Sequence, residues 1–81
     1  MTETLSADVR RFSVHASDEA PGRSHTVEER SFEAAALRFC AEQHPHADLF
    51  GEAAVMVEDC ETGERQCFRI DLGSGDAEPC G

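Results

Sequence analysis

The chain has 81 residues, of which 40% are hydrophobic and 30% charged, and its formal net charge is −10. This length predicts one small domain with a thin stability margin, and the composition is too apolar for a wholly disordered chain. Because 17 acidic residues outnumber 7 basic ones, the sequence argues against a nucleic-acid-binding surface and against docking on anionic membranes. It permits a basic protein partner, or an acidic surface that serves only solubility.

The chain divides into three parts by composition. Residues 1–8 are polar and predict a flexible N-terminus, residues 9–72 carry the periodic apolar patterns of a single domain, and residues 73–81 predict a flexible acidic tail. The N-terminal residues lack the apolar run of a secretory signal, and no stretch approaches the roughly 20 apolar residues of a membrane helix. We therefore expect a cytoplasmic protein whose four cysteines are thiols rather than a disulfide framework.

Two short strands are expected first. Residues 10–16 alternate, with Phe12 and Val14 turned inward, which is the period of a half-buried strand. Residues 17–24 contain aspartate, proline and glycine and predict a loop. Residues 25–29 then form a shorter strand candidate with one valine turned inward.

A helix is predicted over residues 31–44. Ser31 is a good N-cap, and Glu33 in the first turn suits the helix dipole. The residue before Pro45 avoids the α region, so the helix is expected to end there. Apolar residues recur at helical spacing and form one stripe, which comprises Phe32, Ala35, Ala36, Phe39 and Cys40.

The connection after the helix spans residues 46–52. It contains two large apolar residues, Leu49 and Phe50, followed by glycine. We expect both side chains to plug the end of the hydrophobic core.

The clearest signal is a β-hairpin over residues 53–72. Apolar residues alternate on both sides of residues 59–63 (Asp-Cys-Glu-Thr-Gly), in which aspartate suits the first turn position and glycine can take the positive φ that closes the loop. A three-residue loop would mix polarity on one face of the hairpin, whereas a four-residue loop keeps the apolar residues together. The expected cross-strand pairs are Asp59–Glu64, Val57–Gln66, Val55–Phe68 and Ala53–Ile70.

The predicted order is strand, strand, helix, strand, strand. The economical arrangement is an α+β fold, in which a four-stranded antiparallel sheet (ββαββ) has one helix packed on one face. The sheet and the helix then share one core, in which the loss of a phenylalanine should unfold the domain. The expected core comprises Phe12, Val14, Val27, Phe32, Ala36, Phe39, Cys40, Val55, Val57, Phe68, Ile70 and Leu72.

The second face of the predicted sheet is left open. It is mixed in charge, and the expected register places Met56 opposite Cys67. An open sheet face with some apolar content can serve as a partner or dimer surface, although antiparallel sheets commonly leave one side solvated. The candidate interaction surface comprises Arg11, His15, Met56, Glu58, Cys67 and Arg69.

Cysteine and histidine side chains are the candidate metal ligands. Structural zinc sites usually show two tight ligand pairs with two to four residues between the ligands, and this sequence contains no Cys-x-x-Cys. The best available set is Cys60, Cys67 and one of His44 or His46. We assign no metal, because free thiols explain the same residues.

Cys60 and Cys67 also raise redox alternatives. They project to the same face, but they are diagonal in the expected register, and a disulfide needs Cα atoms within ~7 Å. Arg65 and Arg69 flank Cys67 and would favour its thiolate. The ordinary alternative is an inert thiol.

No catalytic pattern is found in the sequence. Ser13, His15 and Asp18 lie close together, but alternate strand residues make no triad without a tertiary pocket. There is no glycine-rich phosphate loop and no G-x-S-x-G, and the acidic turn around Asp59 lacks the other ligands of a calcium loop. We therefore expect no enzyme and no cofactor.

Two segments carry a resemblance to a group of small uncharacterised bacterial proteins. They are residues 31–35 (Ser-Phe-Glu-Ala-Ala) and 57–64 (Val-Glu-Asp-Cys-Glu-Thr-Gly-Glu). In that group a strand pair, a helix that opens on Ser-x-Glu-Ala-Ala and a Thr-Gly hairpin form a compact unit. The resemblance covers about residues 10–72 and implies the ββαββ fold. It implies no functional residue, because the group has no established activity.

These observations predict a non-enzymatic cytoplasmic protein-interaction or regulatory accessory module. A protein partner or a homodimer is expected to use the open sheet face and the acidic rim of the hairpin turn. The alternative is a metal-binding or redox-responsive thiol module that uses Cys60 and Cys67.

Overall fold

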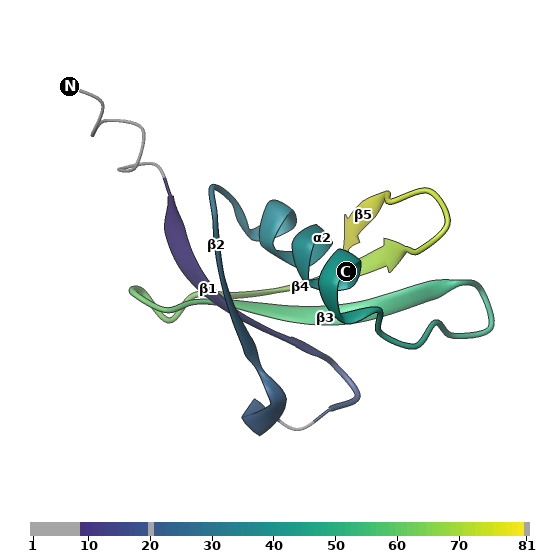
Figure 1. The fold of residues 1–81 in the computed structure, drawn as a ribbon, viewed down its shortest axis with the longest axis horizontal. Helices are drawn as coiled ribbons and strands as arrows, with labels where there is room; N and C mark the ends of the chain where they lie inside the picture. Colours follow the sequence, from purple (N-terminus) through teal and green to yellow (C-terminus); the bar gives the residue numbers. More distant parts are fainter. Residues whose placement is uncertain (1–8, 20, 81) are drawn as a thin grey trace.

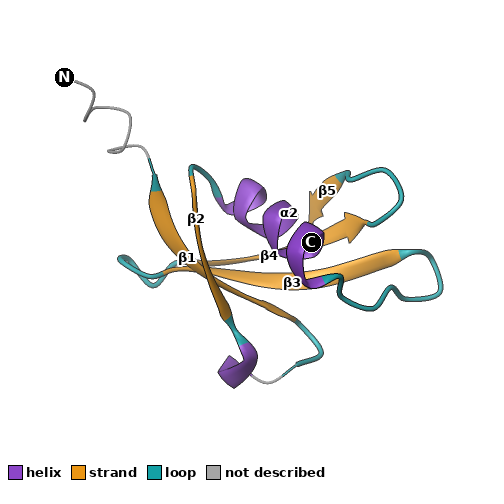
Figure 2. Ribbon diagram, in the orientation of Figure 1, coloured by secondary structure: helices purple, strands orange, loops and turns teal. Residues whose placement is uncertain are grey.

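The chain folds into one antiparallel sheet with a helix on one face (Figure 1). The computed structural model describes residues 9–19 and 21–80, so the prediction of a flexible N-terminus over residues 1–8 lies outside the described residues. In chain order the elements are β1 (Arg10–Ala16), the 3-10 turn η1 (Pro21–Arg23), β2 (His25–Glu29), α2 (Phe32–Gln43), β3 (Glu52–Asp59), β4 (Arg65–Asp71) and β5 (Ala77–Pro79) (Figure 2).

The sheet has the strand order β2-β1-β3-β4-β5, and every neighbouring pair is antiparallel. In Figure 1 the β1–β2 hairpin runs steeply across the nearly horizontal β3–β4 hairpin, which shows the twist of an open sheet. The predicted α+β class is confirmed. The predicted hairpin register is also confirmed, with the pairs Val57–Gln66, Val55–Phe68 and Ala53–Ile70.

The predicted count of four strands is wrong, because the sheet has five. The additional strand, β5, lies within residues 73–81, the predicted C-terminal tail, and it pairs with β4. Its three residues (Ala-Glu-Pro) show no apolar alternation, so the period of the sequence gives no strand signal there. β5 is an edge strand, which is where a sheet tolerates proline.

Helix α2 is the crossover that links β2 to β3. Because β1 pairs antiparallel with both strands, β2 and β3 run parallel to each other and need such a connection. The helix begins after Ser31, whose Oγ accepts a hydrogen bond from the Ala34 amide at 3.1 Å. It ends at His44, which takes a left-handed φ of 49° and donates its N–H to the Cys40 carbonyl at 3.1 Å. The predicted helix is confirmed.

The hydrophobic core lies between α2 and the sheet face formed by β1, β2, β3 and β4. Phe12 of β1 packs against Phe32 of the helix, with ring centroids 4.9 Å apart. Arg38 fastens the helix to β2, because its Nη1 donates to the Glu28 carbonyl at 3.1 Å and to the Glu29 carboxylate at 3.2 Å. One face of the sheet is therefore covered, and the other is left open.

The predicted core is buried except for Leu72, which is 37% exposed. The two side chains expected to plug the end of the core also lie at the surface. Leu49 is 98% exposed and Phe50 is 81% exposed. The plug prediction is therefore wrong, because hydrogen bonds to the Asp48 carboxylate hold residues 48–51 in a surface turn.

Candidate interaction surfaces

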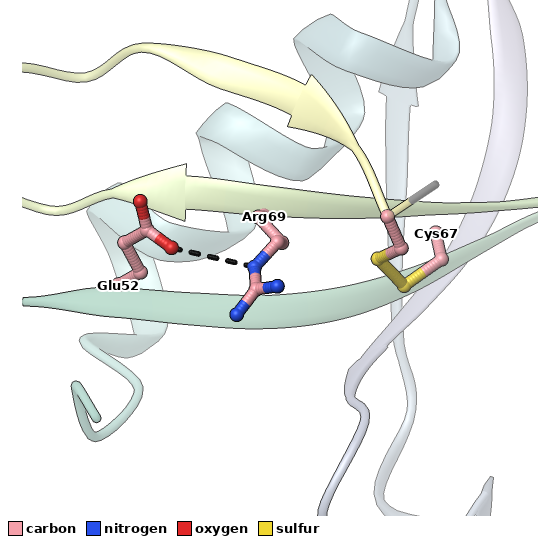
Figure 3. The surroundings of a disulfide bond; sticks show 4 residues. Glu52, Cys67 and Arg69 are labelled. Atoms are coloured by element: carbon pink, nitrogen blue, oxygen red, sulfur yellow. Dashed lines mark ion pairs between the residues drawn. A yellow bond between two sulfur atoms is a disulfide. The ribbon is translucent and has the colours of Figure 1, made fainter. Parts of the chain in front are cut away.

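A disulfide joins Cys67 of β4 to Cys80, which directly follows β5 (Figure 3). Their Cα atoms are 5.3 Å apart, and the Cys80 amide donates to the Cys67 carbonyl at 2.9 Å. The expectation of four thiols is therefore wrong in the structure, where Cys40 and Cys60 are the free cysteines among the described residues. Because Cys67 is bonded to Cys80, it supplies no thiolate to the redox or metal site considered above.

The two free cysteines have different surroundings. Cys40 is buried in the core on α2, and burial raises the pKa of its thiol because the thiolate loses hydration. Cys60 is exposed in the turn between β3 and β4. Cys60 is therefore the accessible nucleophile of the pair.

The candidate metal ligands are not brought together. Cys60 lies in the turn that precedes β4, whereas His44 lines a cavity with Asp71 and Leu72 at the far end of that strand. His46 lies exposed in the connection after α2. Across residues 9–19 and 21–80, no three His, Cys, Asp or Glu side chains are grouped so that they could hold a metal ion.

The open sheet face carries the residues predicted as an interaction surface. Cross-strand register places His15 beside Met56 and Met56 beside Cys67, so these three form one row across β1, β3 and β4. His15 Nδ1 is hydrogen-bonded to Ser24 Oγ at 3.4 Å. The row is only partly exposed, and its most apolar member, Met56, lies between strands on both sides.

Arginines of the open face are paired with acids on neighbouring strands. Such exposed ion pairs contribute about 0–1 kcal/mol each, but they leave the face close to neutral locally. A partner would have to break these contacts or accommodate them. The pairs are Arg11–Glu28 at 3.8 Å, Arg65–Glu58 at 3.9 Å and Arg69–Glu52 at 3.3 Å, the last beside the disulfide in Figure 3.

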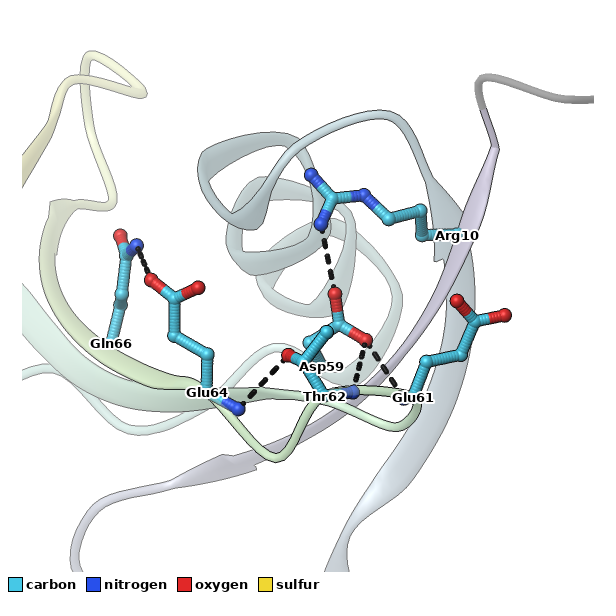
Figure 4. A network of polar contacts seen from close by, with 6 residues as sticks. All are labelled: Arg10, Asp59, Glu61, Thr62, Glu64 and Gln66. Carbon is cyan, nitrogen blue, oxygen red and sulfur yellow. Dashed lines mark hydrogen bonds and ion pairs between the residues drawn. The ribbon is translucent and has the colours of Figure 1, made fainter.

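The acidic hairpin turn is built around the fully buried Asp59 (Figure 4). Its Oδ1 accepts from the amides of Glu61 at 2.8 Å and Thr62 at 3.3 Å, and its Oδ2 accepts from Arg10 Nη1 at 2.9 Å. The Glu61 amide is the chief cause that holds the pKa of Asp59 below its usual value, and Thr62 and Arg10 add to it against the opposing effect of burial. Both carboxylate oxygens thus have partners within the chain, Oδ1 in the turn and Oδ2 on β1, and these contacts give Asp59 a structural role.

A second turn, residues 48–51, presents the exposed Leu49 and Phe50. Asp48 Oδ1 accepts from the amides of Phe50 at 2.8 Å and Glu52 at 3.0 Å. The Gly51 amide donates to the Asp48 carbonyl at 3.1 Å, and Gly51 takes a φ of 78° that favours glycine. These bonds, led by the one from Glu52, also hold the pKa of Asp48 below its usual value. The turn is therefore ordered, with two large apolar side chains in water.

The sequence contains a signal for this turn. Aspartate commonly accepts hydrogen bonds from the amides two or more residues ahead, and glycine three residues later closes such a turn. The pattern Asp-Leu-Phe-Gly over residues 48–51 fits that rule. The apolar character of the two middle residues favours a core plug, but the turn residues on either side of them, Asp48 and Gly51, direct both side chains to the surface.

An apolar cavity of about 340 Å³ lies beside the turn. It sits between the C-terminal half of α2 and the end of β4. The Leu72 amide donates to the Gly51 carbonyl at 3.0 Å, so one wall of the cavity is directly joined to the turn. The connection after α2 and the β4–β5 turn both lie at the right-hand end of the molecule in Figure 1. The lining includes Leu37, Cys40 and Ala41 of α2 and Ile70 and Leu72 of the β4 segment.

These features define a small α+β domain, a five-stranded antiparallel sheet with one helix, held at its edge by a disulfide and carrying an exposed apolar turn. The chain belongs to the Family of unknown function (DUF5961), which matches residues 10–81. No curated protein and no solved structure matches the chain. In the part of the chain that the structure describes, no helix is both long enough and apolar enough to cross a membrane.

The family match agrees with the expected resemblance to small uncharacterised proteins. The bacterial origin and the cytoplasmic location stay predictions. The ββαββ pattern implied by the resemblance is extended by β5.

Proposed function

We propose that this protein is a non-enzymatic protein-interaction module and that the turn 48–51 is its contact element. The observation that carries this proposal is the exposure of Leu49 (98%) and Phe50 (81%) on a turn fixed by the Asp48 carboxylate. A partner that covers such side chains gains the free energy of removing apolar surface from water. Because the turn is already ordered, little conformational entropy is lost on binding.

The turn supports this role better than the open sheet face does. On the open face, Arg11, Arg65 and Arg69 are each paired with a neighbouring acid, and Met56 is only partly exposed. Binding there would desolvate these charges, and desolvation offsets much of the gain from a new contact. Apolar anchors such as Phe50 carry no such cost, and a few anchors of this kind usually dominate the binding energy of an interface.

The test is affinity capture with the full chain from an extract of the cells that naturally produce it. The parent is compared with Leu49→Ser/Phe50→Ser, with the open-face variant Arg11→Ser/Arg69→Ser, and with Val9→Ser. Val9 is a matched control because it is an exposed apolar residue (38%) outside the turn. The expected result is a specific partner that the turn variant loses and the other two variants keep.

Retention of the same partners by the turn variant contradicts the proposed contact element. Loss with the open-face variant instead would favour the surface of Arg11, His15, Met56, Glu58, Cys67 and Arg69 that the sequence predicted. Circular dichroism of each variant ensures that a lost partner does not reflect a lost fold.

A second candidate is a thiol-responsive module, and the Cys67–Cys80 disulfide favours it in place of the predicted pair Cys60 and Cys67. A dithiol reductant would transfer two electrons to this bond, releasing two protein thiols as the reductant becomes a disulfide. The step would free the end of β5 and uncover the edge of β4. Partner capture before and after reduction, repeated with Cys80→Ser, tests whether the bond controls binding. Identical partners in all states would exclude this second function.

A further inference from the structure

The exposed turn and the apolar cavity are neighbours on one molecule. Phe50 projects from the turn with 81% of its surface in water. It is not among the residues that line the neighbouring cavity of its own chain. The hydrogen bond from the Leu72 amide to the Gly51 carbonyl joins the turn to a residue that lines the cavity. A projecting ring and a receiving cavity side by side are the two halves of a self-complementary surface.

The cavity is large enough for an aromatic side chain. A cavity of about 150 Å³ is enough for a benzene ring, and this one measures about 340 Å³. Its lining includes Leu37 and Ala41 of the helix together with Ile70 and Leu72, so its walls are mainly apolar. Asp71 and His44 also line it and supply polar groups.

We propose that the partner of the turn is a second copy of this chain, with Phe50 of each copy entering the apolar cavity of the other across a two-fold axis. This inference rests on the interaction function proposed above. In an isologous dimer the same patch serves both subunits, so a ring and a cavity that lie side by side can both be satisfied at once. Leu49, beside Phe50 on the turn, then covers the entrance.

The area is consistent with a reversible dimer. Burying the exposed parts of Leu49 and Phe50 of both copies, together with the walls that receive them, removes on the order of 900 Å² from water. This area is below that of most stable specific interfaces, so the expected dimer is weak and transient. Association should therefore depend on concentration within an accessible range.

The effect of salt on binding distinguishes a second copy of this chain from a basic protein partner. The chain has a formal net charge of −10, and Asp48, Glu52 and Asp71 lie around the turn and the cavity. Two copies repel each other at long range, so added salt should strengthen the dimer by screening. A basic partner would be attracted instead, and salt would weaken its binding.

The experiment is sedimentation velocity of the full chain with the disulfide intact. All proteins carry Cys60→Ser, because an exposed thiol can link two chains covalently. Concentrations run from about 1 to about 500 µM, at about 50 mM and about 500 mM NaCl. Phe50→Ser removes the ring, and Ala41→Glu blocks the cavity from an exposed helix position. Ala34→Glu makes the same change on α2 outside the cavity lining and is the matched control.

The expected result is a dimer in the parent and in Ala34→Glu, strengthened by salt. Phe50→Ser and Ala41→Glu should each weaken it by about tenfold or more. An equimolar mixture of these two variants should regain part of the association, because the ring of the Ala41→Glu chain can still enter the cavity of the Phe50→Ser chain. This complementation excludes a trivial loss of folding.

A parent that stays monomeric at every concentration overturns the inference, as does a dimer that neither variant weakens. If the parent is monomeric but turn-dependent capture of another protein is observed, only the inference fails and the proposed function stands. If neither self-association nor capture depends on the turn, both fail.

Discussion

Asp59 shows how a single buried charge is stabilised by the chain around it. Among the charged residues within 9–19 and 21–80, Asp59 is the one whose side chain is buried. Its carboxylate accepts hydrogen bonds from two turn amides and from Arg10. A carboxylate with such partners is more stable ionised, so its pKa in the folded chain is lower than in the unfolded chain. The stability of the folded chain around this hairpin turn therefore depends on pH.

The sign of this linkage gives the first prediction. Because the folded pKa of Asp59 is depressed, its contribution is fully present above the unfolded value near about pH 4 and is lost as pH falls towards the folded pKa. Asp59→Asn should lower the melting temperature at pH 6, and the gap between parent and variant should narrow between about pH 4 and pH 2. Arg10→Ala should keep most of the pH dependence, since the Glu61 amide is the larger cause. A gap that does not change with pH contradicts this account.

The free cysteines give a second prediction at the same scale. Cys60 is exposed, whereas Cys40 is buried and burial raises the pKa of its thiol. In the native protein an aromatic disulfide reagent should label Cys60 within minutes and leave Cys40 unlabelled until denaturant is added. Mass spectrometry of labelled peptides identifies each site, and Cys60→Ser should abolish the native signal. Rapid labelling of Cys40 would show that the core opens readily at α2.

At the scale of elements, β5 depends on its links to β4 more than on its own sequence. It spans three residues, and only Ala77 is partly buried against the core. The Cys67–Cys80 bond closes a segment with a sequence separation of 13. Confining a loop of about 15 residues in the unfolded chain is worth about 3 kcal/mol in the chain-entropy model, at least as much as three cross-strand pairs at about 0.2–1 kcal/mol each.

The third prediction follows from this dependence. Cys80→Ser should lower the free energy of unfolding by about 2–4 kcal/mol, measured by urea denaturation with the parent kept oxidised. Hydrogen exchange should become faster in the peptide that covers residues 73–80 and should change little in α2, which shares few contacts with β5. Treating Cys80→Ser with a reductant should cause no further change. Slow exchange of β5 in the variant would show that the strand persists without the bond.

At the scale of the whole molecule, the sequence predicted the parts whose local and tertiary signals agree. The hairpin of β3 and β4 was predictable to the register, because period-two patterning and the turn around Asp59 point to the same pairing. Helix α2 was predictable because Ser31, the apolar stripe and Pro45 agree. The central sheet and its covered face followed from these elements.

The edge strand β5, the exposed turn and the cavity could not be predicted from local sequence patterns. The sequence of β5 shows no apolar alternation, and the strand is held by the disulfide between Cys67 and Cys80, which are 13 residues apart. Such a pairing of cysteines is not determined by sequence alone. The candidate site was missed because Leu49 and Phe50 were assigned to the core by residue type, although the turn of Asp48 and Gly51 directs them to water. The cavity beside the turn arises where α2 and β4 end together, which only tertiary structure reveals.

The contrast between buried and exposed phenylalanine gives the last prediction. Phe39 is 2% exposed and its ring lies 5.7 Å from that of His25, whereas Phe50 lies in water. A domain of this length has a total stability on the order of 4–12 kcal/mol, and Phe39→Ala should remove about 3–5 kcal/mol of it by leaving a cavity. Phe50→Ala should change the free energy of unfolding by less than about 0.5 kcal/mol, because no core contact is lost.

Urea denaturation followed by circular dichroism measures both variants, at a concentration at which sedimentation shows only monomer, so that association does not contribute. If Phe50→Ala destabilises the chain as much as Phe39→Ala, the turn packs on its own core and is not available to a partner. If Phe39→Ala is as stable as the parent, α2 does not cover the sheet as described. Because one residue reports on the core and the other on the surface, the pair separates the requirement for folding from the requirement for binding.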